Sequence, residues 1–101
     1  MYTATKAAVR SLARSFSTEL LPRKIRVNVV SPGVTFTPIF GRLGLDEAQL
    51  QAVATDLLRQ IPLGRFAGGD DIAGGVAYLL SADAAYVLGA EHTIDGGLAQ
   101  L

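Results

Sequence analysis

The chain of 101 residues contains no cysteine, so it can form neither a disulfide framework nor a thiolate metal site. It also has no net charge, because nine basic and nine acidic residues balance to a formal charge of zero. A neutral chain has no long-range field that gathers nucleic acid or an anionic membrane. We therefore expect neither of these partners, and the lack of cysteine fits a reducing compartment.

Long apolar runs are absent as well. The longest covers residues 72–80, about half of what a membrane-spanning helix needs. Met1 is not followed by the basic stretch and apolar core of a secretory leader. These absences predict a soluble, cytoplasmic protein. Half of the residues are apolar, which suits one small folded domain over residues 1–101.

The first chemical feature of the chain is a tyrosine and a lysine four positions apart, Tyr2 and Lys6, at the start of a helical pattern. Residues i and i+4 are neighbours on one face of an α-helix, so the phenol and the ammonium can share a site. A cation at that distance favours the phenolate over the phenol, which lets a tyrosine give and take a proton. The spacing also arises by chance, so the pair alone does not identify a catalytic site.

Helical periodicity predicts a first helix over residues 3–20, which Pro22 ends. Polar residues such as Arg10 and Ser17 fall mostly outside an apolar stripe, and we expect this stripe to have lost part of the sheet that it covers. That stripe consists of Val9, Leu12, Ala13, Phe16 and Leu20. A β-branched run then predicts a strand over residues 25–30, which a Ser-Pro-Gly turn stops.

The second half of the chain predicts two more helices and a strand. Asp46 opens a helix in which Gln49 completes a capping box, and this helix should end near Gln60. Two aspartates at the start of residues 70–80 favour a third helix, and residues 91–95 a last strand. Because helices connect the two strands, the strands should be parallel, in an α/β fold.

Three other groups have an ordinary structural interpretation. The basic residues at 23, 24 and 26 predict a solvated turn, and the aspartates at 70 and 71 predict partners of a helix dipole rather than metal ligands. Ser31, His92 and Asp95 make a poor nucleophilic triad, because His92 alternates with Ile94 on a short strand, as a structural histidine does. We therefore expect no metal site.

Four segments follow one another along the chain in a specific order. They are Tyr-Thr-Ala-Thr-Lys at 2–6, Ile-Arg-Val-Asn at 25–28 with Ser-Pro-Gly at 31–33, Ile-Pro-Leu-Gly-Arg-Phe at 61–66, and Gly-Ala-Glu-His-Thr-Ile-Asp-Gly-Gly at 89–97. Together they resemble the C-terminal part of the short-chain dehydrogenase/reductase family, whose Tyr-x-x-x-Lys motif the first segment matches. The resemblance implies the C-terminal part of a Rossmann-type, doubly wound parallel sheet.

The resemblance also implies an oxidoreductase in which NAD or NADP exchanges a hydride with a small alcohol or ketone substrate. Tyr2 would donate or accept the proton on the substrate oxygen, and Lys6 would assist it and bind the nicotinamide ribose. Backbone groups of Gly33 and Val34 would contact the nicotinamide carboxamide, and Thr37 would also contact the cofactor.

Segments that this family places before the tyrosine have no counterpart in the chain. The pyrophosphate site needs a strand, a glycine-rich turn and a helix N-terminus. Residues 64–69 are rich in glycine but follow no strand, so we do not assign them to it. The catalytic serine and asparagine of the family also precede the tyrosine, and Ser31 and Asn28 do not take their roles. We expect only the nicotinamide end of the cofactor site and no dinucleotide-binding half.

Two functional hypotheses stay open. The chain is either the catalytic C-terminal segment of an oxidoreductase, inactive by itself, or a non-catalytic module for oligomerisation or interaction. In the first case residues 34–66 would form a flap over the substrate. Members of the family commonly associate, so we expect a homo-oligomer in either case.

Overall fold

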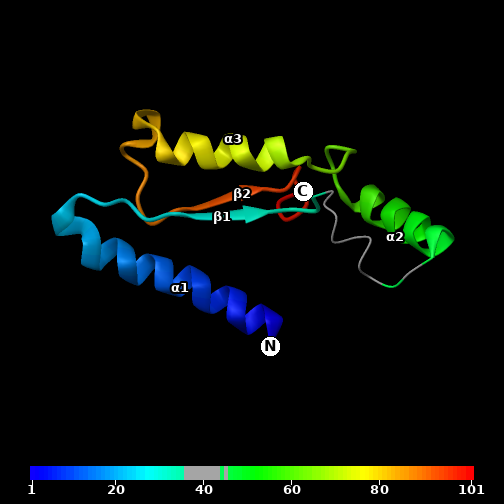
Figure 1. The fold of residues 1–101 in the computed structure, drawn as a ribbon, viewed down its shortest axis with the longest axis horizontal. Helices are drawn as coiled ribbons and strands as arrows, with labels where there is room; N and C mark the ends of the chain where they lie inside the picture. Colours follow the sequence, from blue (N-terminus) through cyan, green and yellow to red (C-terminus); the bar gives the residue numbers. More distant parts are fainter. Residues whose placement is uncertain (36–43, 45) are drawn as a thin grey trace. The chain divides into compact units, whose positions relative to one another are not determined.

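A computed structural model describes residues 1–35, 44 and 46–101 of the chain (Figure 1). The elements, in order, are α1 (Tyr2–Leu20), the 3-10 turn η1 (Leu21–Arg23), β1 (Val29–Pro32), α2 (Glu47–Gln60), α3 (Gly69–Leu80), the 3-10 turn η3 (Ala82–Ala84) and β2 (Glu91–Ile94). These elements form two compact units, Met1–Ser31 with Gly75–His92 and Pro32–Gly74 with Thr93–Leu101. The predicted α/β class and the predicted order of helices and strands are confirmed.

The two strands pair in parallel, as predicted, in a sheet of order β1-β2. In the first unit the Val29 amide donates to the Ala90 carbonyl at 2.9 Å, and in the second the Gly33 amide donates to Ile94 at 2.8 Å. The two bonds keep the same offset along both strands, which is the pattern of a parallel ladder. Strand β2 agrees with the prediction to within one residue.

Strand β1 begins and ends later than the predicted range of 25–30, since it includes Ser31 and Pro32 of the predicted turn, and the side chain of Asn28 explains the later start. Its Oδ1 accepts a hydrogen bond from the Ala90 amide at 2.9 Å, and its Nδ2 donates to the Val87 carbonyl at 3.1 Å. The side-chain amide therefore occupies backbone groups that would otherwise extend the ladder. Regular pairing begins only at Val29, the next residue.

In the first unit, α1 and the end of α3 lie on opposite faces of the strands (Figure 1). Glu91 of β2 contacts Arg10 of α1, whereas the ring of its neighbour His92 lies 5.9 Å from the ring of Tyr78 in α3. Successive side chains of a strand point to opposite faces, which accounts for these two contacts. Helices on both faces of parallel strands are the arrangement of a doubly wound sheet.

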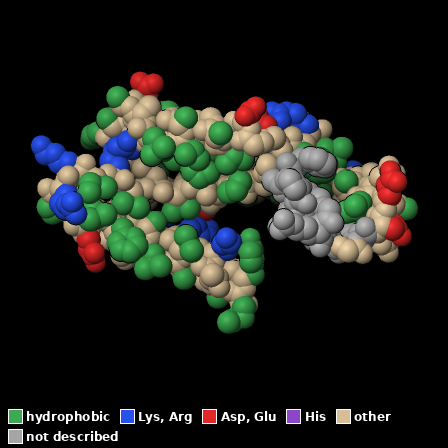
Figure 2. All heavy atoms as spheres, in the orientation of Figure 1, with side chains coloured by type: hydrophobic (Ala, Val, Ile, Leu, Met, Phe, Trp, Pro, Cys, Tyr) green, Lys and Arg blue, Asp and Glu red, His purple; other side chains and the backbone are tan. Residues whose placement is uncertain are grey.

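The most buried residue of α1 does not belong to the predicted apolar stripe. Ser17 is only 6% exposed, and its Oγ donates to the Val27 carbonyl at 2.8 Å. By contrast, Val9, Leu12 and Phe16 are 48%, 53% and 48% exposed. Figure 2 shows apolar side chains at the surface along this helix. Of the predicted stripe, Ala13 and Leu20 are half-buried and the other three residues are exposed, so the described part of the chain covers the stripe only in part.

Arg26 is half-buried, whereas a side chain in a solvated turn would be exposed. Its guanidinium donates to the carbonyl oxygens of Leu79 at 2.8 Å, Val87 at 3.4 Å and Ser81 at 3.5 Å. The last carbonyls of a helix lack partners within that helix, and a cation there complements the helix dipole. Arg26 thus caps the C-terminal end of α3, and the prediction of a solvated turn is wrong for this residue.

In the second unit, α2 begins with the predicted capping box. The Gln49 amide donates to Asp46 Oδ1 at 2.7 Å, while the Asp46 amide donates to Gln49 Oε1 at 3.0 Å. The helix ends at Gln60, as predicted, and Ile61 beyond it is 5% exposed. Among the described residues, none of the helices has the length and apolar character to cross a membrane.

Candidate active site

Helix α1 carries Tyr2 and Lys6 on successive turns at its N-terminal end. Two hydrogen bonds to the Met1 carbonyl, from the amide and the hydroxyl of Thr5, each 2.9 Å long, close the first turn. The Lys6 Nζ lies 5.3 Å from the centroid of the Tyr2 ring, within the range of a cation–π contact. The residue Tyr2 is 76% exposed. The predicted proximity of the two side chains is confirmed, and the phenol is accessible.

Gly33 follows β1 directly, in the second unit. A Cβ atom at this position would lie 2.6 Å from the Cα of Asp95 and 2.7 Å from its Cβ. No side chain fits there, so glycine is what lets the end of β1 lie against the end of β2. The Gly33 carbonyl accepts a bond from the hydroxyl of Thr35 at 3.2 Å, which holds the turn that follows.

Val34 is held by the segment that precedes α3. Its carbonyl accepts a hydrogen bond from the Ala67 amide at 3.1 Å, and Thr35 and Ala67 form an isolated parallel bridge. In the part of the chain that the structure describes, the Val34 N–H has no acceptor. A fixed backbone donor therefore lies just beyond the end of β1.

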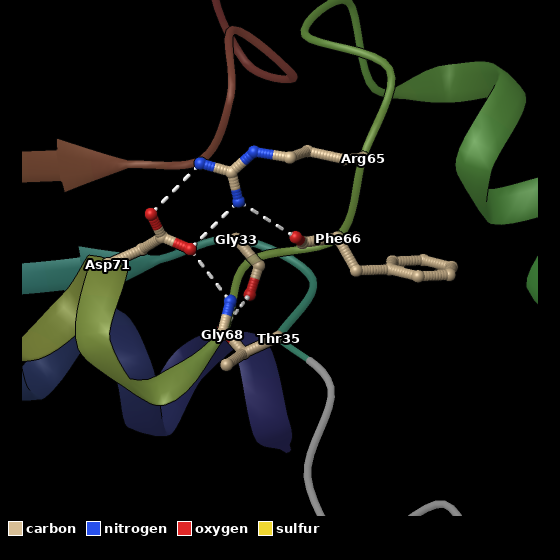
Figure 3. A network of polar contacts seen from close by, with 6 residues as sticks. All are labelled: Gly33, Thr35, Arg65, Phe66, Gly68 and Asp71. Carbon is tan, nitrogen blue, oxygen red and sulfur yellow. Dashed lines mark hydrogen bonds and ion pairs between the residues drawn. The ribbon is translucent and has the colours of Figure 1, made fainter.

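An ion pair between Arg65 and Asp71 organises the same segment (Figure 3). Arg65 donates to both carboxylate oxygens, at 2.8 and 2.9 Å, and to the Phe66 carbonyl at 3.1 Å. The Gly68 amide adds a bond of 2.8 Å to Asp71. The Arg65 hydrogen bond, and then that of Gly68, hold the pKa of Asp71 well below its usual range. Bidentate pairing fixes this turn against the start of α3.

A cavity of about 80 Å³ lies beside this network, with Val34, Ile61 and Ile94 among its walls. Pockets for small ligands usually measure roughly 300–1,000 Å³, so this cavity is not a substrate site. No group of three or more histidines and acidic residues suited to a metal ion gathers within residues 1–35, 44 and 46–101.

The predicted site residues fall into three sets. Tyr2 and Lys6 lie together in the first unit, and Gly33 and Val34 lie in sequence in the second. Thr37 lies outside the described residues, as do the other residues of 36–43 in the predicted flap.

Glu91 makes polar contacts near α1 that the sequence analysis did not predict. Its carboxylate accepts a hydrogen bond from the Ser31 hydroxyl at 2.8 Å and contacts of 3.3 and 3.4 Å from Arg10. The Ser31 bond, followed by that of Arg10, lowers the pKa of Glu91. Its partners are 60 and 81 residues away, and no local pattern signals contacts at such separations.

The family comparison covers almost the whole chain. Residues 1–99 match a family profile described as Enoyl-(acyl carrier protein) reductase. An uncharacterised oxidoreductase of Methylorubrum extorquens is 43% identical over 98 residues, which are 97% of this chain and 38% of that protein. D-erythrulose reductase of Gallus gallus is 38% identical over 97 residues, or 96% of this chain and 38% of the relative. The chain thus spans just over a third of the length of these relatives.

Comparison with solved structures leads to the same class of relatives. An Agrobacterium tumefaciens crystal structure with bound NADP, provisionally a 2-deoxy-D-gluconate 3-dehydrogenase, superposes with a TM-score of 0.82 at 37% sequence identity. The match covers 99% of this chain and 39% of that one. The fold is therefore part of a Rossmann-type sheet, as predicted. With the profile match and the Tyr2–Lys6 contact, this likeness shows that the chain belongs to the short-chain dehydrogenase/reductase family.

Proposed function

We propose that this chain is the C-terminal catalytic segment of an NAD(P)-dependent oxidoreductase that interconverts a small alcohol and a ketone. The observation that carries this proposal is the contact of 5.3 Å between the Lys6 ammonium and the Tyr2 ring, in a chain of this family. The names of the relatives support the reaction class, since one is a reductase of D-erythrulose and another structure contains NADP.

In this proposal Tyr2 gives its phenol proton to the substrate oxygen as the ketone becomes an alcohol, and takes it back in the reverse reaction. The positive charge of Lys6 stabilises the phenolate that remains. The exposure of Tyr2, 76%, leaves its hydroxyl within reach of a substrate. NAD or NADP supplies or accepts the hydride when bound.

From the resemblance, we assign to the described residues contacts with only the nicotinamide end of such a cofactor. The Val34 N–H, which has no acceptor among them, suits a carboxamide oxygen, and the backbone at Gly33 is fixed by Ile94. Lys6 is a donor for a ribose hydroxyl, and Thr37 is assigned a cofactor contact from the resemblance alone. The described ranges hold no strand that leads directly into a glycine-rich turn and a helix. We therefore assign no pyrophosphate contact to this chain.

Two properties support cytoplasmic placement and a small-molecule substrate. The chain has no cysteine, which suits a reducing compartment, and its formal charge of zero gives no attraction to nucleic acid.

Two measurements test this function. The full-length gene product should consume NADH or NADPH when a panel of small ketones is added. The 101-residue chain by itself should show no saturable binding when NADPH is titrated and followed by its fluorescence, because the proposed contacts reach only the nicotinamide. Saturation at micromolar concentration would contradict the second expectation. A full-length product that neither binds a cofactor nor reduces a ketone would favour the non-catalytic module instead.

We also propose that the 101-residue chain self-associates. Val9, Leu12 and Phe16 expose about half of their surface on α1, and the described sheet has only two strands, so each has an open edge. Exposed apolar stripes and open strand edges both favour pairing with another chain, most commonly about a two-fold axis. Size-exclusion chromatography with light scattering at several concentrations should give a dimer or tetramer. A stable, cooperatively folding monomer of 10.6 kDa would refute self-association.

A further inference from the structure

Two polar side chains on one face of helix α1 contact the rest of the first unit, one at Val27, just before β1, and one at β2. Ser17, 6% exposed, donates to the Val27 carbonyl at 2.8 Å. Arg10 contacts Glu91 of β2 at 3.3 Å. The two residues are seven positions apart, or about 10.5 Å along the helix axis. Two separated contacts restrain both the position and the rotation of a helix, whereas one contact would leave it free to pivot.

The Glu91 carboxylate joins three elements. It accepts a hydrogen bond from Ser31 of β1 at 2.8 Å and one from Arg10 of α1, while its own backbone belongs to β2. The Arg10 and Glu91 side chains are 47% and 34% exposed, and ion pairs with that exposure contribute little to stability. We therefore consider the effect of this cluster on the position of α1 rather than on the free energy of unfolding.

The Tyr2–Lys6 pair lies on the same side of α1 as the two attachments. At 3.6 residues per turn, Lys6, Arg10 and Ser17 fall within about 40° of one another around the axis, and Tyr2 lies about 40° beyond Lys6. Any rotation of α1 about its axis therefore moves the phenol and the ammonium. The contact with Arg10 is the attachment nearer to that pair, one helical turn from Lys6.

We propose that the Arg10–Glu91–Ser31 cluster is a positioning device for the Tyr2–Lys6 pair, with Glu91 as its central positioning residue. Glu91 holds Arg10, and through it the N-terminal half of α1, in one rotational setting against the two strands. This inference rests on the proposed function for its effect on catalysis, although the positioning itself does not require turnover.

The first test is Glu91→Gln in the full-length gene product. The substitution removes the charge that attracts Arg10 and keeps an acceptor for Ser31. We expect kcat to fall about tenfold, less than the roughly 100-fold that a misplacement of 1 Å can cost. The KM for the ketone should change less than about twofold, whereas the Kd for NAD(P)H should rise, because Lys6 is assigned to the nicotinamide ribose and moves with α1. Glu19→Gln, the same chemical change elsewhere on α1, is the matched control and should leave kcat unchanged.

The double variant Arg10→Glu with Glu91→Arg restores the attraction with its polarity reversed. It should recover kcat to within about threefold of the wild type, as expected for coupled partners. Three results would each overturn the proposal: a Glu91→Gln variant with wild-type kcat, a loss confined to KM, or a double variant that stays impaired while unfolding at the wild-type temperature.

A second readout is independent of activity. The NMR signals of the Tyr2 ring and of the amides of residues 2–6 should shift in Glu91→Gln and return in the charge-reversed pair. If these NMR signals do not shift in Glu91→Gln, Glu91 does not position α1, whatever the kcat of the variant. If they move but the wild type reduces no ketone, the cluster positions α1 and it is the proposed function that fails.

Discussion

Replacing Tyr2 with phenylalanine in the full-length gene product is expected to lower kcat by about 10² to 10⁴, the usual contribution of general acid–base catalysis. The affinity for NAD(P)H should stay nearly unchanged, because the substitution removes only the oxygen that transfers the proton. Lys6→Ala should lower both kcat and cofactor affinity, since Lys6 is assigned to the phenolate and to the ribose. Steady-state kinetics and fluorescence titration of the cofactor separate these two patterns.

A matched control for this experiment is Tyr86→Phe, which removes the same hydroxyl from a fully exposed tyrosine. It should leave both kinetic parameters at their wild-type values. If Tyr2→Phe kept more than about a tenth of the wild-type kcat, Tyr2 would not be the proton-transferring residue. Equal losses in the two variants would likewise point away from a special role for Tyr2.

Gly33→Ala is expected to destabilise the protein by about 3 kcal/mol, the upper part of the usual range for overpacking. The new methyl group would meet the Asp95 Cα at 2.6 Å, and backbone atoms cannot move aside as a flexible side chain can. The ends of β1 and β2 would have to separate, which weakens the bond from the Gly33 amide to Ile94. Urea unfolding of the full-length gene product measures the difference.

The control for Gly33→Ala is the same substitution at Gly74, inside α3. Among the described residues, no other atom lies within 4 Å of a Cβ at that position, apart from those of the helix backbone itself and the two adjoining residues. Alanine is favoured over glycine in a helix by about 1 kcal/mol, so Gly74→Ala should increase stability. A Gly33→Ala variant as stable as the wild type would show that the strand ends tolerate a side chain.

Local sequence patterns were sufficient to predict the positions of the helices. The capping box of Asp46 and Gln49 predicted both its hydrogen bonds and the start of α2, and the end of α2 at Gln60 was predicted as well. The Tyr2–Lys6 contact also followed from spacing, because residues one helical turn apart lie together wherever the helix is placed. Each of these features depends on groups fewer than about five positions apart.

What the sequence by itself determined about this protein is therefore the identity of its elements and the pairing of Tyr2 with Lys6. The tertiary structure decided where β1 starts, through Asn28 and Ala90, and which side of α1 is buried, through Ser17. The tertiary structure also placed the Glu91 carboxylate against Arg10 of α1. The physical reason is that hydrogen bonds within a helix join neighbours in sequence, whereas these contacts span 10 to 81 residues and exist only once the chain has folded.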